Sequence, residues 1–112
     1  MATNTFNNAQ VQLSTTSVTD VYQAPTSSGA VSVVLSVLCA NVNGTASVDA
    51  TIVKTDSSNT VQSYLAFTIP VPADTSLEVV ANKIVLKAGE KLRAQASAAN
   101  YLNVTISALN IT

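Results

Sequence analysis

The sequence contains no histidine and no tryptophan, and it has one cysteine, Cys39, among 112 residues. Without histidine the chain cannot form a His-based catalytic triad, a His metal site or a His general base, which removes most hydrolase classes. A single cysteine cannot form an internal disulfide, which agrees with a chain made and kept in a reducing compartment. Cys39 lies inside an apolar run with no positive charge nearby, so it is predicted to be a buried structural residue and not a nucleophile.

Charged residues are also scarce, at 10% of the chain, compared with about 25% in an ordinary soluble domain. The formal net charge is -1, which gives no general attraction to nucleic acid or to an anionic membrane. Serine, threonine and asparagine carry most of the polarity, so the surface is expected to be neutral. Because such a surface resists association poorly, we expect it to be buried against partner subunits.

Aromatic residues make up 4% of the chain, too few to line a sugar-binding groove. The carboxylates have no spacing that suggests the convergent pair of a glycosidase. They are Asp20, Asp49, Asp56, Asp74, Glu78 and Glu90. The three glycines are isolated turn residues, so no phosphate-binding loop is present. We therefore predict no catalytic residue, no metal site and no cofactor.

No run is long enough to cross a membrane as a helix. The longest apolar stretch, residues 30–42, is interrupted by Ser32 and Ser36 and is shorter than the roughly 20 residues that a span requires. Residues 1–10 show neither a basic nor an apolar segment, so no secretory signal is expected there. Glycosylation at Asn43, Asn103 and Asn110 is accordingly not expected.

Apolar and polar residues alternate with a period of two from Val11 onward, and no window shows helical periodicity. This pattern predicts eight or nine strands, over residues 10–13, 18–22, 30–42, 47–55, 61–69, 77–80, 84–87, 92–96 and 102–111. Short strands at regular spacing with turn residues between them are typical of a sandwich. The predicted fold class is all-β, a two-sheet antiparallel β-sandwich, with jelly-roll and immunoglobulin-like topologies both open.

Turn residues predict how neighbouring strands connect. Asn43 and Gly44 both tolerate positive φ and predict a hairpin, and residues 56–59 predict a second one. Pro70 and Pro72 are expected to end ladder pairing, because proline has no N–H. Further turns are expected at 82–83, 88–90 and 98–100.

The strand over 30–42 is expected to be partly buried on both faces. Strict alternation places on one face Val31, Val33, Leu35, Val37 and Cys39, and on the other Val34 and Leu38.

The domain prediction is a flexible N-terminal arm over residues 1–9 and one β-sandwich domain over 10–112. The arm is rich in Asn and Thr and has too little apolar surface to fold alone, so it is expected to order only against neighbouring subunits.

Four of the five basic residues, Lys83, Lys87, Lys91 and Arg93, fall within eleven positions. Alternation around Gly89 favours the solvated face of one hairpin, where the lysines would also protect a sheet edge. The alternative is a docking patch for an acidic partner. Residues 56–59 contain oxygen ligands suited to calcium, but with one carboxylate they more simply shape a turn.

Four segments together resemble small virion proteins of tailed bacteriophages. They are Val-Tyr-Gln-Ala-Pro at 21–25, the strand at 37–43 that ends in Ala-Asn-Val, the segment 71–77, and the segment 84–94 with its Leu-Lys-Ala-Gly-Glu-Lys-Leu turn. The resemblance implies a β-sandwich subunit present in many copies, without an active site.

The resulting functional prediction is a non-enzymatic capsid decoration or cement protein, made in the host cytoplasm and located in the virion. Its expected partners are further copies of itself, as a homo-oligomer, and phage structural proteins, with no nucleic acid and no membrane. Two alternatives stay open: a ring component of the neck or tail, and a glycan-binding β-sandwich module.

Overall fold

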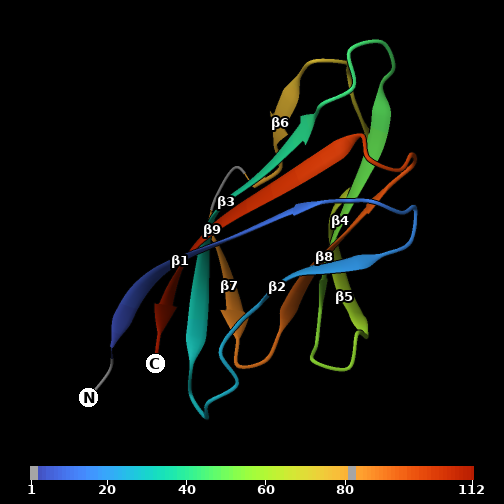
Figure 1. Ribbon diagram of the computed structural model, residues 1–112. Helices are drawn as coiled ribbons and strands as arrows, with labels where there is room; N and C mark the ends of the chain where they lie inside the picture. Colours follow the sequence, from blue (N-terminus) through green and yellow to red (C-terminus); the bar gives the residue numbers. More distant parts are fainter. Residues whose placement is uncertain (1–2, 81–82) are drawn as a thin grey trace.

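The computed structural model describes residues 3–80 and 83–112. Over these residues the chain forms nine strands and no helix, which confirms the predicted all-β class (Figure 1). The strands are β1 (Asn4–Gln12), β2 (Thr19–Gln23), β3 (Val31–Asn41), β4 (Val48–Thr55), β5 (Val61–Val71), β6 (Ser76–Glu78), β7 (Ile84–Lys87), β8 (Lys91–Ala96) and β9 (Leu102–Ile111). No helix long and apolar enough to cross a membrane occurs in this described part.

The strands form two antiparallel sheets, as the β-sandwich prediction requires. One sheet has the order β1-β9-β3, and the far side of β3 pairs with β7 along its first half and with β6 along its second half. The other sheet has the order β2-β8-β4-β5. Long strands from opposite ends of the chain therefore lie side by side, since β1 pairs with β9 over nine residue pairs (Figure 1).

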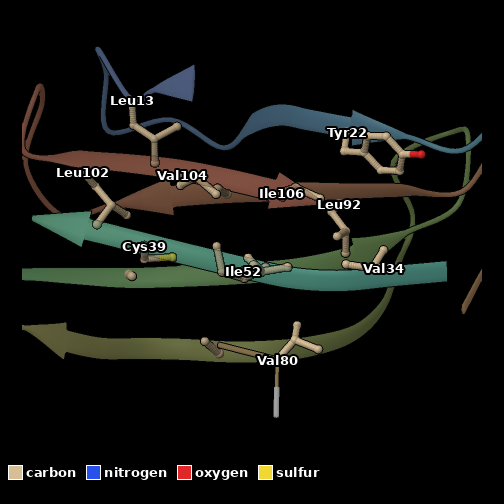
Figure 2. Close-up of a cluster of buried hydrophobic side chains, with 14 of the residues drawn as sticks. Leu13, Tyr22, Val34, Cys39, Ile52, Val80, Leu92, Leu102, Val104 and Ile106 are labelled. Carbon is tan, nitrogen blue, oxygen red and sulfur yellow. The ribbon is translucent and has the colours of Figure 1, made fainter. Parts of the chain in front are cut away.

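The core between the sheets is aliphatic. Figure 2 shows Val34, Cys39 and Ile106 of one sheet packed toward Ile52 and Leu92 of the other. Cys39 is fully buried, as its apolar surroundings in the sequence predict. Burial, with a smaller contribution from the Glu78 charge, raises the pKa of the Cys39 thiol to about 12, so the thiol stays protonated and unreactive.

A β-bulge in β3 makes the predicted faces of this strand partly wrong. Ser32 and Val34 point inward before the bulge, whereas Val37 and Cys39 point inward after it. The register against β9 shifts between Val34 and Ser36. One extra residue inserted into a strand reverses the alternation beyond it, and a strict period of two cannot anticipate that insertion.

The hairpin predicted at Asn43 and Gly44 is wrong, because β3 and β4 belong to different sheets. The loop between them crosses from one sheet to the other. The turn at Gly89 likewise joins β7 and β8 of different sheets, so Lys87 is not on one hairpin with Lys91 and Arg93. Local turn chemistry is the same in a hairpin and in a sheet-to-sheet connection, and only long-range packing separates the two. The hairpin at 56–59 is confirmed by the pairing of β4 with β5.

The N-terminal segment differs from the expected flexible arm. Residues 4–9 belong to β1 and pair with β9 without a register shift. Apart from Phe6 and Ala9 the segment is polar, so its sequence lacks the alternation that predicts a strand. Backbone hydrogen bonds to β9 hold it in place. Met1 and Ala2 lie outside the described residues, as does Asn82 of the turn predicted at 82–83.

Pro70 does not end ladder pairing as expected, because β5 continues through it to Val71. β5 is an edge strand, where the missing N–H of a proline can face away from the sheet.

Candidate assembly surfaces

The outer face of the five-stranded sheet carries a row of apolar side chains. Phe6 of β1 lies opposite Leu109 of β9, Leu109 lies opposite Val33 of β3, and Val33 lies opposite Val85 of β7. Directly opposed residues of an antiparallel pair point to the same face, so these four side chains form one line across four strands. Phe6 is 78% exposed and Val85 is 53% exposed. We refer to Phe6, Leu109, Val33 and Val85 as the apolar row.

The rest of this face is mainly polar and carries a charge of each sign, Lys87 opposite Val31 and Glu78 opposite Leu38. The neighbouring position adds Val31 and Ile111, which are also opposed to each other and partly buried. Beyond the bulge the cross-strand positions change to Asn8, Ser107 and Ser36. The face therefore has an apolar end and a hydroxyl- and amide-rich end.

A second apolar patch lies on the outer face of the four-stranded sheet. The rings of Tyr64 and Phe67 meet edge to face with their centroids 4.9 Å apart. Both rings are more than half exposed, and they border a hollow of about 120 Å³ lined also by Val18, Val53 and Arg93. This small hollow is open to other side chains, but it is too small to enclose a sugar or a cofactor.

Ion pairs lie on the same outer face, where β2 pairs with β8. Asp20 of β2 accepts from Lys91 Nζ at 3.1 Å and from Arg93 Nε of the adjacent strand β8. Burial alone would raise the pKa of Asp20, but the hydrogen bonds and charges of Lys91 and Arg93 outweigh it and lower that pKa below its ordinary value. The predicted basic cluster is thus divided. Lys91 and Arg93 pair with Asp20, whereas Lys83 and Lys87 are exposed elsewhere.

The candidate calcium loop shapes a turn. Asp56 Oδ1 accepts the backbone N–H groups of Ser58 at 2.8 Å and Thr60 at 3.0 Å. Its lone pairs are directed into the loop, as the turn interpretation of the sequence expects. Among the residues with described positions, no three His, Cys, Asp or Glu side chains gather where they could hold a metal ion.

The apolar row was missed at the sequence level for two reasons. Phe6 is a single aromatic in a polar segment, and its strand could not be recognised. Val33 and Val85 were recognised as strand residues. Because the bulge follows Val34, Val33 points outward although Val37 and Cys39 point inward, and the sheet order then aligns Val33 with Phe6.

No model of a known protein family matches the chain, and no curated protein sequence matches it. Two solved structures share its fold over nearly the whole length. A chain in the acidic stable capsid structure of Helicobacter pylori bacteriophage KHP30 superposes with a TM-score of 0.60 at 12% identity, covering 100% of this chain and 94% of that one. A chain of the Bacillus endospore appendages, described as a family of disulfide-linked pili, superposes with a TM-score of 0.54 at 12% identity, covering 99% of this chain and 88% of that one. At this identity the likeness shows that the chain has the same β-sandwich fold as these two proteins.

Proposed function

We propose that this protein is a non-enzymatic structural subunit of a bacteriophage virion that binds the capsid in many copies as a decoration or cement protein. The observation that carries the proposal is the apolar row on the outer face of the five-stranded sheet. An exposed line of apolar side chains on a nearly neutral face is a docking surface for another protein, because burying it removes unfavourable hydration at little electrostatic cost.

Two further features support a role in assembly. The chain carries 10% charged residues, so little charge would be desolvated when its faces are covered by neighbours. The fold also matches a chain of a phage capsid structure from end to end. Fold alone does not define function, so the proposal depends on the exposed row first and on this likeness second.

A non-enzymatic role agrees with the chemistry of the side chains. The Cys39 thiol is buried and protonated, and Asp20 and Asp56 are engaged in an ion pair and a turn. Ser36 Oγ donates to Glu78 Oε1 at 2.6 Å, but this pair is exposed on the sheet surface, and the same carboxylate also accepts the Val37 N–H at 2.8 Å.

The test uses particles of a phage that carries this gene, prepared with and without it. Purified protein is added to the particles that lack it, and bound protein is measured by gradient sedimentation. We expect saturable binding at a fixed number of copies per capsid. The doubly substituted variant Phe6→Ser/Val85→Ser should bind at least about tenfold more weakly, because it loses two exposed apolar contacts.

Tyr64→Ser is the control, since it removes from the opposite face an aromatic side chain that is as exposed as Val85. It should bind like the unsubstituted protein. Equal loss of binding in both variants would refute the assignment of the docking face, and no binding to any particle would refute the virion role. Electron microscopy of gold-labelled protein separates the shell from the neck or tail, since label confined to one vertex would favour the ring component.

A further inference from the structure

The edges of the two sheets are not equally protected against pairing with another strand. Exposed edges present unpaired N–H and C=O groups, and proteins protect them with short strands, charges, prolines and bulges. β6 has three residues, and β7 has four and ends in Lys87. β2 carries Asp20 and a register irregularity after it, and β5 carries Pro70 and three irregularities.

β1 has none of these features. It has nine residues, its register against β9 is continuous, and it contains no proline and no charge. The first charged residue of the sequence is Asp20. On its other side β1 pairs with no strand in the described part of the chain. It is therefore the long, regular and uncharged edge of this sandwich.

The hydrogen bonds at the ends of the strand show which backbone groups are free. Thr3 N–H donates to Thr112 O at 2.8 Å, and Thr112 N–H donates to Thr3 O at 3.0 Å. Such doubly bonded pairs occur at every second residue of an antiparallel ladder. The groups that point away from β9 are therefore those of Asn4, Phe6, Asn8, Gln10 and Gln12. In agreement, Asn8 N–H donates to the neighbouring Asn7 side chain at 2.9 Å.

We propose that β1 pairs antiparallel with β1 of a second copy of this chain, across a twofold axis at Asn8. The five outward-facing residues are arranged symmetrically about Asn8, so this register uses the whole strand and forms about ten backbone hydrogen bonds. It places Phe6 opposite Gln10 of the other copy and Asn4 opposite Gln12. Phe6 then covers the aliphatic part of a glutamine side chain.

A second copy suits this edge better than a different partner. The strand is uncharged, so it faces itself without repulsion, and it offers no charge that would select a charged partner strand. Because the paired strand has the same five outward positions in reverse order, each outward N–H and C=O finds a counterpart, and the Asn8 N–H exchanges the Asn7 Oδ1 acceptor for the Asn8 carbonyl of the other copy. The two five-stranded sheets become one continuous sheet, with their apolar rows on the same face.

Disulfide trapping tests the register. Directly opposed residues of a hydrogen-bonded pair have Cα atoms about 5.5 Å apart, within the range of a disulfide. Under mild oxidation Asn8→Cys should form a covalent dimer by itself. Gln12→Cys alone should not, but a mixture of Asn4→Cys and Gln12→Cys should. The native Cys39 is buried and does not interfere. Efficient dimer formation by Gln12→Cys alone, or none by Asn8→Cys, would overturn the proposed register.

Light scattering coupled to size-exclusion chromatography tests the interface without introduced cysteines. The unsubstituted protein should be a dimer at about 100 µM, and Asn8→Lys should be a folded monomer because two lysines would face each other. The matched control is Ser107→Lys, which adds the same charge to the same face at the residue opposite Asn8, one strand inward. It should stay dimeric.

A monomeric unsubstituted protein, or a dimer that survives Asn8→Lys, would overturn the proposal. Since these measurements use purified protein without capsids, they are independent of the proposed virion function.

Discussion

The side chain of Asn41 provides the sharpest test of how the sandwich is held together. Asn41 ends β3 where the chain crosses to the other sheet, and it is 3% exposed. Its Nδ2 donates to Ala46 O and to Val71 O, each at 2.9 Å, and its Oδ1 accepts from Asn43 N at 2.9 Å. One side chain thus ties the crossover loop to the end of β5.

Replacement of Asn41 by alanine removes three hydrogen bonds and leaves buried carbonyl groups without donors. At about 1 kcal/mol net for each bond, with an added cost for unsatisfied groups, Asn41→Ala should lower the free energy of unfolding by about 3 kcal/mol. The Asn41→Asp variant should be no more stable than Asn41→Ala at neutral pH, because a carboxylate cannot donate hydrogen bonds to the two carbonyl groups.

Urea denaturation followed by far-ultraviolet circular dichroism measures this free energy, with Asn103→Ala as the matched control. Asn103 Oδ1 is buried and, among the described residues, has no hydrogen-bond partner. Its removal should change the free energy of unfolding by no more than about 0.5 kcal/mol. If the two alanine variants differ by less than about 1 kcal/mol, the proposed role of the Asn41 hydrogen bonds is refuted.

Three further predictions concern other side chains. The Tyr22 hydroxyl is hydrogen-bonded to Ser32 Oγ at 2.7 Å and donates to Asn110, so it links the two sheets. Tyr22→Phe should cost about 1–3 kcal/mol, and its effect should couple with that of Ser32→Ala in a double-mutant cycle, whereas strictly additive effects would contradict the link. Cys39 should resist thiol reagents in the native protein and react in urea, and fast labelling of the native protein would argue against burial. Because folding raises the pKa of the Cys39 thiol, its contribution to stability is full below the unfolded pKa of about 8.5 and is lost as pH rises from there through the folded pKa. Because folding lowers the pKa of Asp20, its contribution to the free energy of unfolding is present above the unfolded pKa of about 3.9 and is lost as pH falls through the lower native pKa. Asp20→Asn should therefore reduce the loss of stability at acid pH. An unchanged dependence of stability on pH would count against the ion pairs.

The sequence was most informative where structure depends on near neighbours. Leu102, Val104, Ile106 and Ala108 alternate with polar residues, and all four point into the core as the pattern predicts. The turn at Asp56 was also predicted, since its side chain bonds backbone groups two and four residues away. The burial of Cys39 followed from its apolar surroundings.

The candidate surfaces depended on contacts between distant residues. The basic cluster was visible in the sequence, but Asp20, which binds two of its members, lies about seventy residues earlier, and no local pattern connects them. The apolar row joins residues from four strands, and neither the arm prediction for Phe6 nor the alternation in β3 could align them.

The all-β class, most strand positions, the aliphatic core and the absence of histidine chemistry could all be predicted, because these properties depend on composition and on residues two positions apart. Three features became visible only in the folded chain: residues 4–9 form a strand, the Asn43 and Gly89 turns cross between sheets, and Leu35 lies at a bulge. The physical reason is that backbone hydrogen bonds between strands are nearly independent of side-chain type. Which strands pair, and which edge remains open, is therefore set by how the whole chain packs.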